Sequence, residues 1–400
     1  MRYNFSESTM KMKASKIREL MKYASMPGVI SLAGGNPDPV NFPFPDVKEI
    51  IGKWSPERAA MAMQYGPTGG FPPLVGLIKE RMKLRHLNPE GQDVILTTGG
   101  QQGLFLATKI FVDPGDVIIV EDPSFIGAVA SFLSNGAELA GIPLESDGVD
   151  TDKLESTILS LKKQGKKVKF FYTIPNFQNP TGVTMSQEKR KRIYDISVKY
   201  NLVILEDDPY GELYFKGNLD DYRPIKSYGN AAPIIYLGSF SKIMCPGFRL
   251  GWLFGDEAVI DKAGLAKQSI DACSSSFGQV IAYDYLTTDA IDRYLMKMRE
   301  VYKHKRDVML AEIARFFPAG IKTTRPDGGF FVFVDLPNGM SGDKLFKIAI
   351  EEKVAFITGE PFFSDPIEGD KYLRLAYSNS SDEQISKGIE LIGRAMKNYK

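Results

Sequence analysis

The sequence is poor in cysteine and histidine, and this scarcity excludes several kinds of chemistry. Cys245 and Cys273 are its only cysteines, too few for a disulfide framework, and they favour a reducing compartment. His86 and His304 are its only histidines, so a zinc site with cysteine and histidine ligands is not expected. A Ser–His–Asp triad would need one of these two, and neither lies near a nucleophile motif. We therefore expect no metal site.

The sequence also lacks an excess of charge of one sign and long apolar runs. Lys and Arg total 50 and Asp and Glu total 49, a formal net charge of +1, which provides no basic surface for nucleic acid or an anionic membrane. No apolar run approaches the ~18 residues of a membrane span, and the N-terminus has no apolar signal-peptide core. We expect a cytoplasmic protein that binds neither nucleic acid nor membrane.

The chain has 400 residues, of which 43% are hydrophobic, enough for about two domains of ~100–200 residues. Apolar runs rich in β-forming residues alternate with helical patterning such as 101–111 and 187–200. This alternation predicts an α/β fold with a mostly parallel sheet covered on both faces. The predicted strands lie at 94–97, 117–120, 168–173, 202–205, 234–237 and 250–254.

The pattern changes from about residue 279. A long, charged helical stretch runs towards residue 316, and strand-like runs at 330–336 and 372–378 precede a terminal helix. This order is typical of a smaller α+β domain. We expect a large domain over 46–285, with a mostly parallel sheet of the seven-stranded type, and a small domain formed by 1–45 and 286–400.

The segment GSFSK, 238–242, follows one predicted strand. Ligands of open α/β sheets bind beyond the carboxyl ends of strands, where Lys242 can form an imine with a carbonyl cofactor. The hydroxyls of Ser239 and Ser241 suit phosphate oxygens, and Arg249 offers a planar fork of donors for the same group. Taken alone, these residues could equally be a surface lysine in a polar turn and an arginine in a structural ion pair.

Two further strand ends carry polar side chains. Asp207, Asp208 and Tyr210 follow the strand at 202–205, where one carboxylate can pair with a protonated pyridine nitrogen and the phenol can donate to a ring oxygen. Adjacent acids point in different directions, so at most one serves a site, and a polar turn or a metal pair is the alternative. Asn179, before Pro180 and Thr181-Gly182, can hydrogen-bond a ring oxygen or simply form a turn.

A fourth strand end is rich in glycine. TTGGQQGL, 97–104, passes from a strand into a helix, and free backbone N–H groups at Gly100 and Gln101 favour an anion, although a simple cap is the alternative. Phe125 can stack on a flat ring or belong to the core. Four strand ends thus carry residues suited to one phosphorylated pyridine aldehyde.

Together, N-P-T-G, D-D-P-Y, S-F-S-K with Arg249 seven positions after the lysine, and Y-L-R-L resemble fold-type I pyridoxal 5′-phosphate (PLP)-dependent aminotransferases of class I/II. The motifs occur in the family's order over nearly the whole chain. SKIREL, SLAGGNPDP, QYGPTGG and TTGGQQGL are similar to the 2-aminoadipate and kynurenine aminotransferase group.

The resemblance implies a role for each matching residue. Lys242 would be the Schiff-base lysine and proton carrier, Asp207 the partner of the pyridinium nitrogen, and Asn179 and Tyr210 the partners of the phenolic oxygen. Phe125 would occupy the stacking position. The phosphate would be held by Gly100, Gln101, Ser239, Ser241 and Arg249.

Substrate and subunit contacts follow from the same resemblance. Arg374 would bind the substrate's α-carboxylate, with Gly35 nearby, and Arg18 aligns with an arginine that contacts the side chain in 2-aminoadipate enzymes. Tyr65 would reach the phosphate of the neighbouring subunit, which implies a homodimer with shared sites. We expect ping-pong transamination of an α-amino acid, with 2-oxoglutarate as acceptor, through pyridoxamine phosphate.

Two alternatives to transamination remain. A PLP lyase or synthase of the same fold would hold the cofactor with the same motifs. Aminotransferase-like transcription regulators carry an N-terminal winged helix, and here the aminotransferase pattern begins by Ser15 and leaves no room for one.

Overall fold

The computed structural model describes residues 3–6, 9–10, 20, 22–24, 26–337 and 339–399. Its centre is an eight-stranded sheet in the order β2-β9-β8-β7-β6-β3-β4-β5. The five strands from β8 to β4 run parallel, and β9 is antiparallel to both of its neighbours. The strands are β2 (Gln92–Thr97), β3 (Val117–Asp122), β4 (Glu138–Glu145), β5 (Gly148–Val149), β6 (Val168–Thr173), β7 (Val203–Asp207), β8 (Ile234–Ser239) and β9 (Gly251–Asp256).

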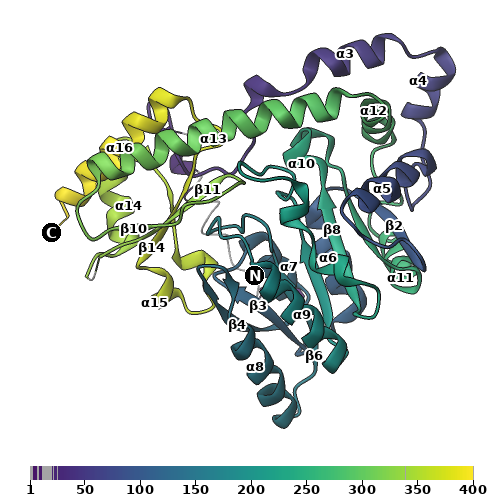
Figure 1. Ribbon diagram of the computed structural model, residues 1–400, viewed down its shortest axis with the longest axis horizontal. Helices are drawn as coiled ribbons and strands as arrows, with labels where there is room; N and C mark the ends of the chain where they lie inside the picture. The colour runs from purple at the N-terminus through teal and green to yellow at the C-terminus, as the bar shows by residue number, and fades with distance from the viewer. Residues whose placement is uncertain are drawn as a thin grey trace.

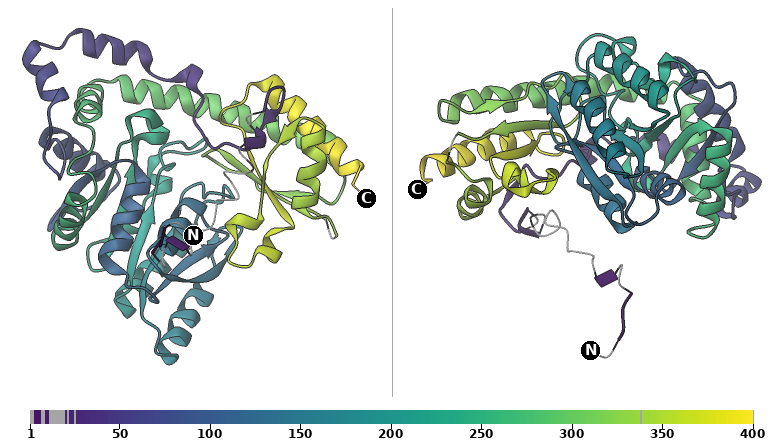
Figure 2. Two further views of the ribbon diagram at one scale, coloured as in Figure 1. Left: turned by 180° about the vertical axis from the view of Figure 1, so that it is seen from behind. Right: turned by 90° about the horizontal axis from the view of Figure 1, so that it is seen from below.

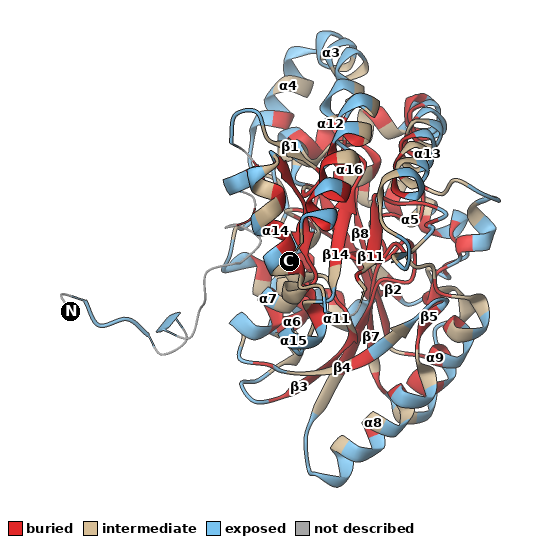
Figure 3. Cartoon of the chain, turned by 90° about the vertical axis from the view of Figure 1, so that its left-hand side faces the viewer, coloured by how far each residue is buried: buried red, intermediate tan, exposed pale blue. Residues whose placement is uncertain are grey.

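Helices cover both faces of this sheet, which explains why its strands are continuous apolar runs. Residues of α6, α7 and α11 form one core with one face of the strands, and residues of α8 and α9 form another with the opposite face. Figure 3 shows the strands as a buried centre with exposed helix surfaces around it. The helices are α5 (Pro72–Leu84), α6 (Gly100–Phe111), α7 (Ile126–Ser134), α8 (Thr151–Lys163), α9 (Gln187–Tyr200), α10 (Phe240–Ile243), α11 (Glu257–Gln268) and α12 (Ser276–Leu286).

A second, four-stranded sheet lies beside the first, in the order β10-β11-β14-β13 (Figure 1). Helix α13 (Ala290–Phe316) runs from α12 along the molecule and packs on α16 (Asp382–Lys397). The early strand β1 (Ile30–Ser31) pairs in parallel with β12 (Val354–Ala355). The remaining elements here are β10 (Lys322–Thr323), β11 (Phe331–Asp335), β13 (Ile357–Thr358), β14 (Tyr372–Ala376), α14 (Gly342–Glu351) and α15 (Pro366–Gly369).

The helices α3 (Phe44–Gly52) and α4 (Pro56–Met63) project from one corner of the molecule (Figures 1 and 2). Helix α3 buries no residue and α4 buries only Ala62. Val47 and Ile50 of α3 pack partly against the core, whereas Phe44, Met61 and Met63 are exposed, so part of the apolar surface of these helices has no cover within the described part of the chain.

The predicted α/β fold with a mostly parallel sheet is confirmed, with two differences in detail. Strands β4 and β5 were not predicted, so the sheet has eight strands and not the expected seven; in β4, ELAGIPLE, glycine, proline and two acids interrupt the apolar residues. The helical stretch predicted from about 279 to 316 is two helices, α12 and α13, separated by residues 287–289. No described helix is both long and apolar enough to cross a membrane.

Candidate active site

Lys242 lies at the carboxyl end of β8. The strand ends at Ser239, whose side chain accepts a hydrogen bond from the Ser241 amide and caps the short helix α10. The Lys242 amine donates to the Gly35 carbonyl at 2.8 Å. Burial, and after it the positive charges of Arg374 and Arg249, together lower the pKa of this amine to about 8. Among the described residues, no carboxylate lies within ion-pairing distance to favour the charged amine. A large share of the amine is therefore uncharged near pH 8.

Arg374 reaches the same place from β14. Its Nη1 donates to Asn179 Oδ1 at 2.8 Å and its Nη2 to the Ala33 carbonyl at 2.7 Å. The guanidinium carbon lies 4.4 Å from the ring centroid of Phe331 and 5.1 Å from that of Phe362. Its Nε is buried without a hydrogen-bond partner, and burial lowers the pKa of the group to about 10. A buried cation without an acidic partner is suited to an anionic ligand.

Asn179 and Tyr210 complete this group. Asn179 accepts from Arg374 and is near enough to the buried Tyr210 hydroxyl to lower the pKa of that phenol, and the Lys242 amine lies 5.9 Å from the centroid of the Tyr210 ring. Burial holds the pKa of Tyr210 above its usual range, so the phenol stays protonated. The structure therefore brings Lys242, Arg374, Asn179, Tyr210 and Gly35 together from five separate parts of the chain.

Asp207 and Asp208 face opposite sides of the sheet, as their adjacency predicts. Asp208 is the structural acid, since Arg85 pairs with it at 2.7 Å and the side chains of Asn176 and Tyr236 also donate to it. Among the residues that the structure describes, Asp207 accepts a single hydrogen bond, from Tyr172 at 2.8 Å. Burial raises the pKa of Asp207 to about 7, the Tyr172 hydrogen bond opposes this rise, and the charge of Asp208 adds to it.

The residues predicted to bind an anion converge at the start of α6. No side chain caps this helix, and Gly100 at its first turn lies against Ser239. A Cβ on Gly99 (φ 76°) would lie 2.5 Å from a guanidinium nitrogen of Arg249, so only glycine lets this arginine approach. Backbone N–H groups, hydroxyls and a guanidinium thus meet in one cradle.

Gln101 and Phe125 lie together beside this cradle. The Gln101 side chain donates to the Gly127 carbonyl at 2.8 Å. A Cβ on Gly127 would lie 2.4 Å from the Phe125 ring and 2.8 Å from Gln101, so both side chains cover this glycine. The Phe125 ring is half-buried rather than part of the sealed core.

Tyr65 and Arg18 are not brought into this group. Tyr65 is 87% exposed and has no side-chain partner among the described residues. Arg18 lies outside the described residues. Gly35, in contrast, is fixed in the site, because a Cβ there would lie 2.4 Å from the Phe331 ring.

Several contributors were not predicted from the sequence. Tyr172 is hidden in the apolar strand VKFFYT, where a tyrosine is expected to be core. Phe331 and Phe362 flank Arg374 through pairing of distant strands and loops, and the Ala33 carbonyl acts through backbone alone. Only the position of Tyr172, the last residue but one of a strand whose carboxyl end lies at the site, could have indicated its role.

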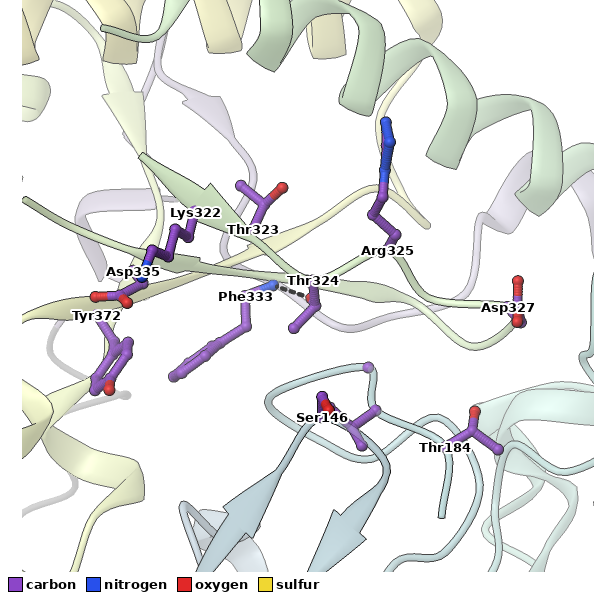
Figure 4. A pocket seen from close by; sticks show the side chains of 12 residues that line it. Ser146, Thr184, Lys322, Thr323, Thr324, Arg325, Asp327, Phe333, Asp335 and Tyr372 are labelled. Atoms are coloured by element: carbon purple, nitrogen blue, oxygen red, sulfur yellow. Dashed lines mark hydrogen bonds between the residues drawn. The ribbon is translucent and has the colours of Figure 1, made fainter. Parts of the chain in front are cut away.

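A separate cavity of about 480 Å³ lies between the second sheet and two loops of the first. Its side chains do not converge: Lys322 and Asp335 lie at one end, and Arg325 extends away from Ser146 and Thr184 (Figure 4). None of the predicted site residues lines it. The candidate active site is therefore the cluster around Lys242.

An amine, an acid and an anion cradle thus lie at the carboxyl ends of strands of the main sheet, and a buried guanidinium reaches the same place from β14 of the second sheet. The family model described as "Aminotransferase class I and II" matches residues 27–392. The chain belongs to this family and is an aminotransferase of fold type I, the family that works with PLP.

Similar proteins cover almost the whole chain. The aromatic-amino-acid aminotransferase 1 of Thermococcus litoralis is 42% identical over 394 residues, 98% of this chain and 94% of that relative. The structure of Pyrococcus horikoshii kynurenine aminotransferase in complex with PMP has a TM-score of 0.94 at 38% identity, covering 98% of this chain and 97% of its own. The α-aminoadipate aminotransferase of Thermus thermophilus, complexed with N-(5′-phosphopyridoxyl)-L-leucine, has a TM-score of 0.89 at 35% identity, covering 99% and 97%. The predicted resemblance is confirmed.

Proposed function

We propose that this aminotransferase binds PLP covalently through Lys242 and transfers the amino group of an α-amino acid to a 2-oxo acid. The observation that carries the proposal is the buried Arg374 guanidinium beside the half-buried Lys242 amine, with no carboxylate within ion-pairing distance of either among the described residues. An isolated buried charge is costly. An amino acid carboxylate and a phosphorylated aldehyde supply the partners that these groups lack.

The chain's residues fit each part of PLP. Gly100, Gln101, Ser239, Ser241 and Arg249 would hold the phosphate, Asp207 the ring nitrogen, and Asn179 and Tyr210 the phenolic oxygen, while Phe125 would lie against the ring. The uncapped start of α6 beside Arg249 supports the phosphate position, and the open oxygen of Asp207 supports the nitrogen position. When bound, PLP acts as an electron sink that acidifies the Cα proton of the amino acid.

The chain's own groups would then orient the substrate and move one proton. Arg374 binds the α-carboxylate through its forked N–H groups, and its contact with Asn179 fixes the direction of that fork. The Lys242 amine accepts the Cα proton, a role favoured by a pKa lowered to about 8. Gly35 lets the backbone lie close to Phe331, where a Cβ would be 2.4 Å from the ring, and its carbonyl accepts from the amine.

We further propose a broad choice of amino donor with 2-oxoglutarate as the acceptor. The relatives named above act, by their names, on aromatic amino acids, kynurenine or α-aminoadipate. Arg18 is the residue of this chain proposed to contact an acidic donor side chain. A panel of amino donors with 2-oxoglutarate, analysed by product mass, tests this range, and activity with glyoxylate alone would contradict the proposed acceptor.

A homodimer with shared sites is part of the proposal. The uncovered surface of α3, α4 and the loop after them carries Phe44, Met61, Met63 and Tyr65, all exposed. An exposed apolar surface of this kind favours a second copy of the chain. Tyr65 would then contribute its hydroxyl to the partner's phosphate cradle.

The experiment that tests the proposal is a half-reaction. Holoenzyme mixed with an amino acid and no 2-oxo acid should release about one 2-oxo acid per site and then stop, because the amino group stays on the enzyme. Adding 2-oxoglutarate should restart turnover. Continuous release of ammonia without an acceptor would instead identify a lyase, and Lys242→Ala is the control that should release nothing.

A further inference from the structure

Tyr172 and Asp207 lie on the same face of neighbouring parallel strands. Tyr172 of β6 is in register with Leu205 of β7, and Asp207 lies two residues further along. The Tyr172 hydroxyl donates to Asp207 Oδ2 at 2.8 Å. Tyr172 is 0% exposed and Asp207 is 6% exposed, so water does not compete for this hydrogen bond.

This hydrogen bond is the only one that the described residues make to the Asp207 carboxylate. The neighbouring Asp208 accepts from the side chains of Arg85, Asn176 and Tyr236 and from a backbone amide. Asp208 is therefore saturated, whereas Asp207 has one oxygen held and Oδ1 without a donor. The orientation of the Asp207 carboxylate depends on one hydroxyl.

The same hydroxyl bears on the charge of Asp207. The pKa of this carboxyl is raised to about 7, because burial and the charge of Asp208, which raise it, outweigh the hydrogen bond from Tyr172, which lowers it. Hydrogen bonding to the charged form is thus the one local influence that favours the carboxylate. A ring nitrogen can keep its proton only beside an ionised acid.

We propose that Tyr172 is a positioning residue that fixes Oδ2 of Asp207, leaves Oδ1 for the ring nitrogen of PLP, and keeps the carboxylate ionised beside it. This inference rests on the proposed function, since it assigns Asp207 to the cofactor nitrogen. Tyr172 itself touches neither substrate nor cofactor in this account. It acts through Asp207 alone.

The test compares two buried tyrosines that each donate to one of the adjacent acids. Tyr172→Phe removes the donor to Asp207, and Tyr236→Phe removes the donor to Asp208 at 3.0 Å. Both proteins are reconstituted with PLP labelled with ¹⁵N in the ring. In Tyr172→Phe the ring-nitrogen signal should move towards that of unprotonated pyridine, and the dissociation constant of PLP should rise roughly tenfold, the loss of a hydrogen bond to a charged group.

Tyr236→Phe should lower the unfolding temperature but leave the nitrogen signal and the dissociation constant as in the unmodified protein. An unchanged nitrogen signal in Tyr172→Phe, or an equal change in both variants, would overturn the inference. If Tyr172→Phe does not fold, site-specific 3-fluorotyrosine at position 172, a stronger donor, should move the signal the other way, and no movement overturns the inference. Unmodified protein that fails to attach PLP to Lys242 would refute the proposed function instead.

Discussion

At the scale of single residues, the adjacent acids have different roles: Asp207 is proposed to bind the cofactor, and Asp208 stabilises the fold. Asp208 neutralises the buried Arg85, so Asp208→Asn should leave an unpaired buried charge and destabilise the fold by about 3–5 kcal/mol. The pKa of Asp207 is raised from 3.8 to about 7, so its ionisation lowers the stability of the apo fold as the pH rises between these two values, and the full cost is present at pH 8. Asp207→Asn should therefore stabilise the apoprotein at pH 8 while reducing turnover by at least about a hundredfold.

Urea unfolding of both apo variants and their turnover numbers test this pair. The expected result is a crossed pattern: Asp208→Asn loses stability first, and Asp207→Asn loses turnover first. Equal losses of stability in the two variants would show that Asp207 is a structural acid as well.

The Lys242 amine gives a prediction about pH. Its pKa is lowered to about 8, from an ordinary 10.5, by burial and by Arg374 and Arg249. Only the neutral amine reacts with an aldehyde, so the rate of PLP attachment should rise with pH to about 8 and then level off. Arg374→Leu removes one of the two positive charges and should move the midpoint upwards.

Absorbance changes after mixing apoprotein with PLP over a series of pH values measure this rate. A rate that still rises at pH 10 would show that the amine has an ordinary pKa and that burial does not affect it.

At the scale of elements, the close approach of α6 to Arg249 depends on glycine. Gly99→Ala would place a Cβ 2.5 Å from the Arg249 guanidinium, at a φ of 76° that also disfavours alanine. We expect the arginine to be displaced and the dissociation constant of PLP to rise about tenfold or more, the value of one charge-assisted contact.

Gly165→Ala is the matched control. Gly165 has a similar φ of 70° with no atom near its Cβ, so the variant should show the backbone strain alone and bind PLP normally. Equal PLP affinity in the two variants, measured by fluorescence titration, would remove the Gly99–Arg249 contact from the cofactor site.

The elements also show what the sequence could and could not predict. The apolar strands β2, β3, β6, β7, β8 and β9 were predictable, because strands buried on both faces must be apolar throughout. Strand β4 was not, since it lies next to the two-residue edge strand β5 and is mostly half-buried or exposed, so it tolerates glycine and proline. The break between α12 and α13 lies at Thr287–Thr288–Asp289, where no glycine or proline marks a helix end.

The site residues were predictable where short motifs end a strand, as with Lys242, Asp207 and Asn179. Tyr172 was not, because its hydroxyl matters only once β6 and β7 pair in register and Asp207 falls on the same face. Periodicity can assign a residue to a face of one strand, but it cannot state which hydroxyl of a neighbouring strand reaches a given acid.

At the scale of the whole molecule, the proposal of shared sites predicts complementation between subunits. Lys242→Ala removes the amine, and Tyr65→Ala removes a side chain that is 87% exposed in one copy. Each variant alone should be nearly inactive when PLP is limiting. Refolding them together should restore about a quarter of the activity, because half of random dimers are mixed and each mixed dimer has one complete site.

Activity equal to the sum of the separate variants would show that Tyr65 does not act across a subunit boundary. Sedimentation at the assay concentration is the control, since the prediction holds only where the protein is dimeric.

The central claim is that Lys242 carries the cofactor, and one measurement addresses it directly. Holoenzyme treated with borohydride, which makes a lysine–PLP linkage permanent, is digested and analysed by mass spectrometry, with Lys242→Ala as the control. We predict one phosphopyridoxyl group per chain, on Lys242, and none in the variant. A label on a different lysine, or no label on a chain that transaminates, would contradict the account.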